Sequence, residues 1–391
     1  MKVFLNDEHI GELSEDPMGY SFCYKKGWKR PISQSLPIRE EPYRVEAMRF
    51  FGNLLPEEEV RDEMAKILKV DVKSDYEFFK AAGHDLAGAL HFGEGESRKP
   101  ELIQLKEAGF RRKRLSVKEI LGNEKPKFSL AGAQSKLGVT YKDEKLYLPV
   151  GQPSTHILKI DGLKFPAVQN EIFCSNLAKR IGLDVPKVLP ILKGENLFSL
   201  HERYDREKGK RIHQEDLLQA LSREYGHKYE DRGGPGLKKL YEMVKSTSDE
   251  VTTDQDRFLD WVLFNFLIRN GDAHAKNLSL LYTDKGIRFA PLYDLICTSI
   301  FKEHIDTHLA ITIAGEKDFN KVCEKHFKAL ALELKVGEKY VLSRLKEMAN
   351  LIMDEISEVE GPWKEYCTAK KLTNKTVKVA KEIKKQAKRF I

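Results

Sequence analysis

The strongest constraint on the fold is a core helix that ends in a polar loop. Four apolar side chains recur at helical spacing and predict a wide buried face: Phe258, Trp261, Val262 and Phe266. The turn pair Asn270-Gly271 follows and ends this helix. The next residues, 272–277, combine a carboxylate, an imidazole and an amide. We expect a polar loop at the end of a core helix to carry chemistry.

Upstream of this helix the chain is rich in short extended runs. Residues 137–141 and 146–150 flank a polar turn and predict a hairpin, and 155–160 predict a further strand. One helix is predicted near 173–181. The first segment reads as a hairpin over 3–13 followed by helical patterns. The order is therefore β-rich first and helical afterwards.

Positive charge is concentrated at the C-terminus. The chain of 391 residues has a net charge of +7, but residues 370–391 hold nine basic residues and one acid, so the rest is nearly neutral. The tail shows near-helical apolar spacing. One interpretation is a basic helix that contacts DNA phosphates, and the other is a surface helix that packs its apolar stripe on the body. Loss of DNA binding after trimming the chain at Lys370, with catalysis untouched, would show that the two activities are separable.

Other features exclude whole classes of protein. The N-terminus lacks the unbroken apolar core of a signal peptide, and the longest apolar stretch is too short to span a bilayer. The five cysteines are widely spaced and contain no pair typical of a zinc or redox motif. We therefore predict no membrane association and a reducing, cytoplasmic location.

The loop after the core helix has the spacing of a phosphotransfer site. Asp272 precedes Asn277 by five residues, the offset of the Asp and Asn in a protein-kinase catalytic loop. A hairpin predicted from residues 278–282 and 287–292 would bring Asp294 beside Asn277. An amide oxygen and a carboxylate together suit Mg²⁺. A zinc site at His274 is disfavoured, because no second His or Cys lies at ligand spacing.

Two lysines upstream are candidates for binding phosphate. Lys159 closes an apolar strand, where an ammonium group is costly unless it meets an anion; an edge strand with a snorkelling amine is the alternative. Glu171 could pair with Lys159, as in the kinase Lys–Glu ion pair, or simply favour the helix dipole. Lys136 follows a loop of small residues, 129–135, whose backbone N–H groups could approach phosphate oxygens.

These motifs, in this order, resemble the HipA-like serine/threonine kinases, toxins of bacterial type II toxin–antitoxin systems. The resemblance covers the chain to about residue 300. It is carried by residues 50–56, 129–136, 154–159, 170–171, 202–206, 214–216, 233–236, 272–277 and 291–294. It implies an α+β, two-lobed protein-kinase-like fold with a β-rich N-terminal part and an all-helical C-terminal lobe. The expected domains are 1–115 (N-terminal, HipA-type), 116–205 (nucleotide-binding lobe) and 206–391 (helical lobe with the basic tail).

The resemblance implies roles for residues at matching positions. Asp272 resembles the catalytic base, Asn277 and Asp294 the Mg²⁺ ligands, and Lys159, aided by Lys136, the ATP-phosphate lysine. The remaining implied contacts with ATP are at Glu202, Tyr204, Asp205, Gln214, His274 and Tyr293. Glu202 and Tyr204 match the hinge that receives adenine through backbone groups.

The resemblance also implies regulation and partners. Ser129 matches a serine whose autophosphorylation inactivates the kinase, although Ser135 offers a second hydroxyl in the same loop. The implied partners are an HTH-type, HipB-like antitoxin on operator DNA and a protein substrate such as an aminoacyl-tRNA synthetase. Two alternatives stay open: a small-molecule kinase on the same scaffold, and a non-catalytic corepressor module bound to an HTH antitoxin.

Overall fold

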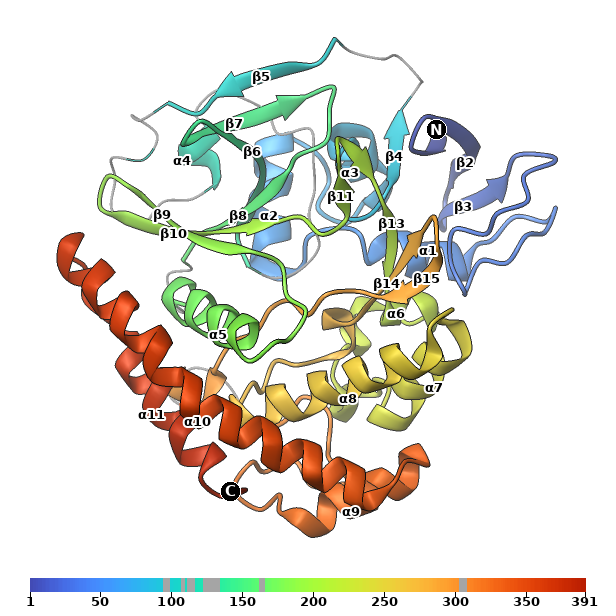
Figure 1. Ribbon diagram of the computed structural model, residues 1–391. Coiled ribbons are helices and arrows are strands. Elements are labelled where there is room, and N and C mark those ends of the chain that lie inside the picture. Colours follow the sequence, from blue (N-terminus) through green and yellow to red (C-terminus); the bar gives the residue numbers. More distant parts are fainter. Residues whose placement is uncertain (94–98, 107–109, 111–116, 122–133, 162–165, 302–307) are drawn as a thin grey trace. The chain divides into compact units, whose positions relative to one another are not determined.

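The chain forms two compact units that are each built from several chain segments (Figure 1). The computed structural model describes residues 1–93, 99–106, 110, 117–121, 134–161, 166–301 and 308–391. The first unit comprises Met1–Gly162, Pro190–Gly226 and Ser279–Lys285. The second comprises Leu163–Leu189, His227–Leu278 and Gly286–Ile391.

The first unit begins with a four-stranded antiparallel sheet in the order β3-β2-β1-β4. Its strands are β1 (Lys2–Leu5), β2 (Glu8–Asp16), β3 (Gly19–Tyr24) and β4 (Leu90–Gly93). Three helices accompany it: α1 (Val45–Gly52), α2 (Glu58–Leu68) and α3 (Asp75–Ala82). Aromatic rings from α1, α3 and the sheet form the core here, with Phe51 against Phe22, Phe79 and Phe92. The predicted N-terminal hairpin is confirmed by the β1–β2 pairing.

The same unit holds a six-stranded sheet in the order β5-β7-β6-β8-β10-β9. Its strands are β5 (Glu101–Gln104), β6 (Lys136–Lys142), β7 (Lys145–Val150), β8 (His156–Lys159), β9 (Val188–Lys193) and β10 (Asn196–Glu202). The predicted hairpin is confirmed, with Thr140 opposite Tyr147. Short elements complete the unit: α4 (Val117–Leu121), β11 (Arg206–Glu207), β12 (Lys210–Arg211), β13 (His213–Asp216), α6 (Leu217–Ala220) and β14 (Ser279–Thr283).

The second unit is mainly helical. Its helices are α5 (Val168–Arg180), α7 (Leu237–Thr247), α8 (Val251–Leu267), α9 (Glu324–Leu334), α10 (Glu338–Ala369) and α11 (Thr376–Ala387), and β15 (Gly286–Phe289) is a short strand. The predicted core helix is α8, and its last ten residues are almost all buried. Asp254 in α8 binds Arg288 through both carboxylate oxygens, at 3.0 and 3.1 Å, and so ties β15 to α8.

The basic tail is an integral helix of the second unit. The apolar side chains of α11 are buried, among them Val379, Ala380 and Ile383, and α11 contacts α10, α5 and α8. The expectation that the stripe packs on the body is therefore confirmed. Its lysines lie on the opposite face, with Lys378, Lys381, Lys385 and Lys388 exposed.

The observed elements confirm the predicted fold class, a mixed α/β protein with a β-rich N-terminal part and a helical C-terminal region. The three-part domain division stays a prediction. Among the described residues, no helix has the length and apolarity needed to cross a bilayer.

A fully buried carboxylate joins the N-terminal segment to strands β13 and β14 inside the first unit. Glu215 on β13 accepts hydrogen bonds from the Ser33 hydroxyl at 2.5 Å, from the Gln34 N–H at 3.0 Å and from the Tyr282 hydroxyl. Burial raises the pKa of Glu215 to about 7 even though three donors favour the ionised form.

This carboxylate predicts a pH dependence of stability. The pKa of Glu215 is higher in the folded chain than in the unfolded one. Its contribution to the free energy of unfolding is therefore complete below about pH 4.5 and is lost as the pH rises through about 7. We expect the Glu215 contribution to the free energy of unfolding, measured by urea titration as the difference between the wild type and Glu215→Gln, to fall by on the order of 2 kcal/mol across this range. Taking the difference is necessary because burial lowers the pKa of His213 to about 4, so that His213 titrates in much of the same range with the opposite effect in both proteins. Glu215→Gln removes this part of the dependence, whereas exposed Glu207→Gln keeps it. An equal slope in both variants would contradict the assignment.

Candidate active site

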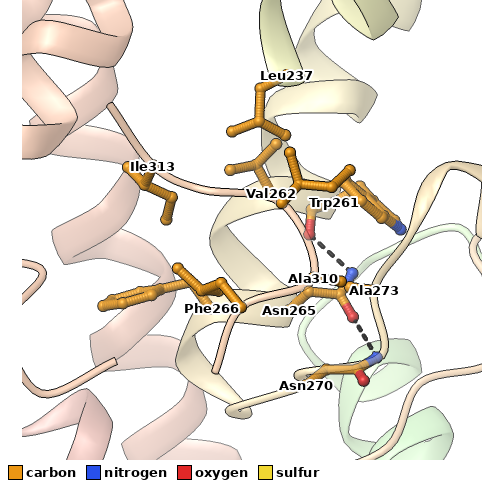
Figure 2. A pocket seen from close by; sticks show the side chains of 11 residues that line it. Leu237, Trp261, Val262, Asn265, Phe266, Asn270, Ala273, Ala310 and Ile313 are labelled. Carbon is orange, nitrogen blue, oxygen red and sulfur yellow. Dashed lines mark hydrogen bonds between the residues drawn. The ribbon is translucent and has the colours of Figure 1, made fainter. Parts of the chain in front are cut away.

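The loop after α8 is held by the side chain of Asn270. Its amide nitrogen donates to Asn265 Oδ1 at 2.7 Å and to the Asp294 carbonyl at 3.2 Å, and its Oδ1 accepts from the Asp272 N–H at 3.0 Å. Asn265 in turn donates to the Trp261 carbonyl at 2.9 Å, as Figure 2 shows. One buried amide therefore fixes the backbones of both segments that carry the predicted base and metal ligands.

Asp272 presents a partly solvated carboxylate. Its side chain is 47% exposed, and its Oδ1 accepts a hydrogen bond from the Tyr229 hydroxyl at 2.5 Å. The imidazole Nε2 of buried His274 lies 3.9 Å from the same oxygen. One carboxylate oxygen is thus oriented by its neighbours, an arrangement that suits a general base whose second oxygen faces an acceptor hydroxyl.

Asn277 and Asp294 lie in the same hydrogen-bonded group as Asp272. Asn277 Nδ2 donates to the Asp272 carbonyl at 2.8 Å, which leaves its amide oxygen as the atom for a cation. The Tyr293 hydroxyl donates to the Lys276 carbonyl at 2.7 Å, and Asp294 adopts φ +55°. Aspartate is among the side chains that adopt this left-handed conformation most readily.

The donor set fits a hard divalent cation. An amide oxygen and a carboxylate are ligands that Mg²⁺ accepts, with water or phosphate oxygens completing its shell. Within the described ranges no three His, Cys, Asp or Glu side chains gather as a metal site.

The strands β14 and β15 flank the turn where the hairpin was predicted.

A small pocket borders this loop in the second unit (Figure 2). Ala273, next to Asp272, forms part of its wall together with Trp261, Val262 and Phe266 of α8 and residues 309–311 and 313. Its two amide side chains, Asn265 and Asn270, are engaged in the bonds described above. The remaining lining is apolar.

In the first unit, strand register brings the two predicted phosphate lysines together. Lys136 on β6 is the direct cross-strand partner of Lys159 on β8. Their phosphate-binding role stays a prediction. Strand β8 lies between β6 and β10, so the alternative of an edge strand for Lys159 is wrong. Glu171 is buried in the first turn of α5 in the second unit, and its pairing with Lys159 stays a prediction.

The predicted hinge, residues 202–205, is anchored by a buried ion cluster. Arg203, 1% exposed, binds Asp205 through two nitrogens, at 2.9 and 2.7 Å, and Ser154 Oγ at 3.0 Å. Arg206 donates to Asp85 at 2.8 Å, and the Gly88 N–H donates to Asp205 at 2.7 Å. The cluster therefore fixes the chain that leaves β10 to the loop that precedes β4.

Ion pairs with arginine decide the direction in which the pKa values of the two buried aspartates shift. Burial alone would raise the pKa of Asp85 and of Asp205, but Arg203 and Arg206 outweigh it and hold both below their ordinary values. Both Asp205 oxygens are engaged within the protein. Its predicted place lining the nucleotide site stays a prediction.

The remaining predicted residues divide between the units. Gln214 lies on β13 opposite Leu281 in the first unit, and Ser129 lies outside the described residues. The sequence analysis missed Asn270, Tyr229 and the Arg203–Asp85 contact. The sequence did contain one local sign of the Asn270 contact. Asn265 interrupts an apolar run, and Asn270, its partner, follows five residues later.

The ion cluster predicts a large cost for removing one partner. Asp85→Ala leaves Asp205 as the one carboxylate that pairs with both Arg203 and Arg206, so buried positive charge loses a counterion and we expect a loss of about 3–5 kcal/mol in the free energy of unfolding. Glu8→Ala removes the exposed Arg30–Glu8 pair, which is worth less than about 1 kcal/mol. Urea titration of both variants measures the difference. Similar losses in the two would show that the cluster is not stabilised by pairing.

Comparison with known proteins places this geometry in a family. The model of the HipA N-terminal domain matches residues 1–93, and that of the HipA-like C-terminal domain matches residues 128–361. "Putative kinase Y4mE" of Sinorhizobium fredii is 35% identical over 384 residues, which is 92% of this chain and 91% of that protein.

A further relative and a solved structure come from Shewanella oneidensis. Its "Serine/threonine-protein kinase toxin HipA" is 30% identical over 387 residues, covering 92% of this chain and 89% of that protein. A solved complex of the toxin–antitoxin system HipA, HipB and operator DNA matches with a TM-score of 0.85 and 26% identity, covering 100% of this chain and 97% of the matched chain. The predicted resemblance is therefore confirmed, and the chain belongs to the HipA family.

Proposed function

We propose that the chain is an ATP- and Mg²⁺-dependent serine/threonine protein kinase that acts as a HipA-like toxin. One observation carries the proposal: the Asn270 amide ties the Asp272 segment to the Asp294 backbone, while Asn277 bonds to Asp272 at kinase spacing. The kinase names of its relatives support the same chemistry.

Asp272 is proposed as the catalytic base. The Tyr229 hydroxyl holds Oδ1, so Oδ2 accepts the proton of the acceptor serine or threonine. The hydroxyl oxygen then forms a bond to the γ-phosphorus as the bond to the β-phosphate oxygen breaks, and ADP leaves. The proton stays on Asp272 until solvent removes it.

Asn277 and Asp294 are proposed to hold Mg²⁺ through the amide oxygen and the carboxylate. The cation neutralises charge on the transferring phosphoryl group. The hydrogen bond from Asn277 Nδ2 to the Asp272 carbonyl determines which amide atom is available. The base and the ligands are therefore oriented by one set of bonds.

Nucleotide recognition is proposed for the residues of the first unit. The cross-strand lysines, Lys136 and Lys159, contact ATP phosphates, and the backbone at Glu202 and Tyr204 receives adenine. Gln214 in this unit, and His274 and Tyr293 in the second, are proposed to line the nucleotide. His274 is supported by its place beside Asp272 and Tyr293 by its bond to the Lys276 carbonyl.

Regulation and partners follow from family membership. Autophosphorylation at Ser129 would add negative charge near ATP phosphates and repel them. An antitoxin of the HipB kind is the proposed partner, since the matched complex contains HipB. The acceptor protein, a translation component such as an aminoacyl-tRNA synthetase, rests on the family resemblance alone.

Catalysis is tested by mass spectrometry after incubation with ATP and Mg²⁺. We expect phosphate on Ser129 in the wild type and a loss of about 100-fold or more in the rate of transfer in Asp272→Asn, because the base is removed. Asp284→Asn, an exposed carboxylate in the turn after β14, serves as the matched control and retains activity.

The other outcomes separate the alternatives. Phosphate on Ser135 instead would move the regulatory site by six residues. ATP hydrolysis or binding without labelled protein would favour a small-molecule kinase. Absence of ATP binding would contradict the proposal and favour the corepressor module.

A second role, contact with DNA through the antitoxin complex, is favoured by the outer face of α11. Lys378, Lys381, Lys385 and Lys388 lie on this exposed face, and the matched complex contains operator DNA. Phosphate contacts of this kind position a protein on DNA without reading the sequence.

The salt dependence of DNA binding tests this role. In complex with a HipB-like antitoxin, changing these four lysines to Gln is expected to lower the slope of log K against log salt by up to about 0.9 for each DNA phosphate that a lysine no longer neutralises. The control changes four exposed lysines of α9, α10 and the turn between them, Lys325, Lys328, Lys335 and Lys339. Equal slopes in both sets would rule out a specific contact by α11.

A further inference from the structure

The buried face of α11 contains one polar side chain that reaches the catalytic segment. Gln386 is fully buried in a stripe that is otherwise mostly apolar. Its Oε1 accepts hydrogen bonds from Arg269 Nη1 at 3.0 Å and from Arg389 Nη1 at 2.9 Å. The amide nitrogen of Gln386 is buried without a hydrogen-bond partner among the described residues, which is costly, so the two bonds to Oε1 are the polar contacts that favour this residue here.

Arg269 is the residue directly before Asn270, and its side chain is almost completely enclosed. Besides Gln386, its guanidinium donates to Ser299 Oγ at 2.8 Å and to Asn320 Oδ1 at 3.2 Å, and Glu382 of α11 lies 3.8 Å away. The C-terminal helix thus supplies an acceptor and a negative charge to the arginine that begins the catalytic loop.

Backbone hydrogen bonds connect Arg269 to the loop that follows it. Arg269 adopts φ +58° as the residue after the C-cap of α8, a left-handed position that commonly ends a helix, and the Asn270 N–H donates to the Asn265 carbonyl at 2.9 Å to close this end. Its carbonyl accepts from the Thr298 N–H at 3.1 Å and the Thr298 hydroxyl at 3.2 Å. The same hydroxyl oxygen accepts from the Gly271 N–H at 2.7 Å, one residue before Asp272.

We propose that Arg269 and Gln386 are positioning residues for phosphoryl transfer, and that α11 is part of the catalytic unit. This inference rests on the proposed kinase function. Gln386 lies beyond residue 361, where the match to the HipA-like C-terminal domain ends. Trimming the chain at Lys370 is therefore expected to remove catalysis together with any DNA contact, so this truncation does not separate the two activities.

Variants of the full-length chain distinguish positioning from packing. Gln386→Leu keeps the side-chain size and removes the acceptor, while Gln386→Glu keeps an acceptor oxygen. Ile383→Val, on the same buried face, controls for a loss of packing. The measurements are the autophosphorylation rate constant at saturating ATP, the ATP concentration that gives half of it, and hydrogen exchange of the segment 268–278.

Gln386→Leu is expected to lower the autophosphorylation rate constant about ten-fold, because the catalytic base is misplaced. The ATP concentration that gives half of the maximal rate should not change. Hydrogen exchange in the segment 268–278 should become faster. Gln386→Glu is expected to restore the rate, and Ile383→Val to retain both wild-type values. Equal effects of Gln386→Leu and Ile383→Val, or unchanged exchange in Gln386→Leu, would overturn the inference. An inactive wild type would refute the kinase function, and exchange would still decide whether α11 holds the loop.

Discussion

A polar loop at the end of an apolar helix keeps one geometry only if its buried donors and acceptors are bonded. Here the Asn270 side chain meets that requirement by bonding to Asn265, to the Asp272 N–H and to the Asp294 carbonyl. Because each partner lies on a different segment, one amide sets the position of the proposed base relative to the segment of a proposed metal ligand. Precise placement is what phosphoryl transfer demands of a protein, since little covalent chemistry is left for it to do.

The constraint in the first unit is different, because charged side chains lie buried close to one another. The charges of the cluster around Arg203 and Asp85 pair with one another within the protein, so the cluster stabilises a backbone. Lys136 and Lys159 lie directly opposite each other on neighbouring strands, where we propose that they bind ATP phosphates. Buried charged residues thus serve structure in one place and proposed recognition in the other.

Local patterns predicted the elements and most of the candidate site. The spacing of Asp272 and Asn277 and the cost of a lysine in an apolar strand are properties of short segments, so they were readable. The anchors were not, because they depend on contacts between distant residues: Arg203 and Asp85 are 118 residues apart, and Arg269 and Gln386 are 117 apart. In the tail the apolar spacing predicted packing correctly, whereas Gln386 gave no sign of its partner because a glutamine in a basic helix reads as surface. The resemblance predicted from the sequence ended near residue 300 and so gave no information there, although the HipA-like C-terminal domain in fact matches as far as residue 361.

The most direct measurement is a crystal structure of the chain with Mg²⁺ and a non-hydrolysable ATP analogue. The predicted result is a cation with the Asn277 amide oxygen and the Asp294 carboxylate at about 2.1 Å, and with Asp272 Oδ2 facing the γ-phosphate. A cation bound without these two residues, or an analogue bound away from Lys159 and Asp272, would contradict the proposed kinase site.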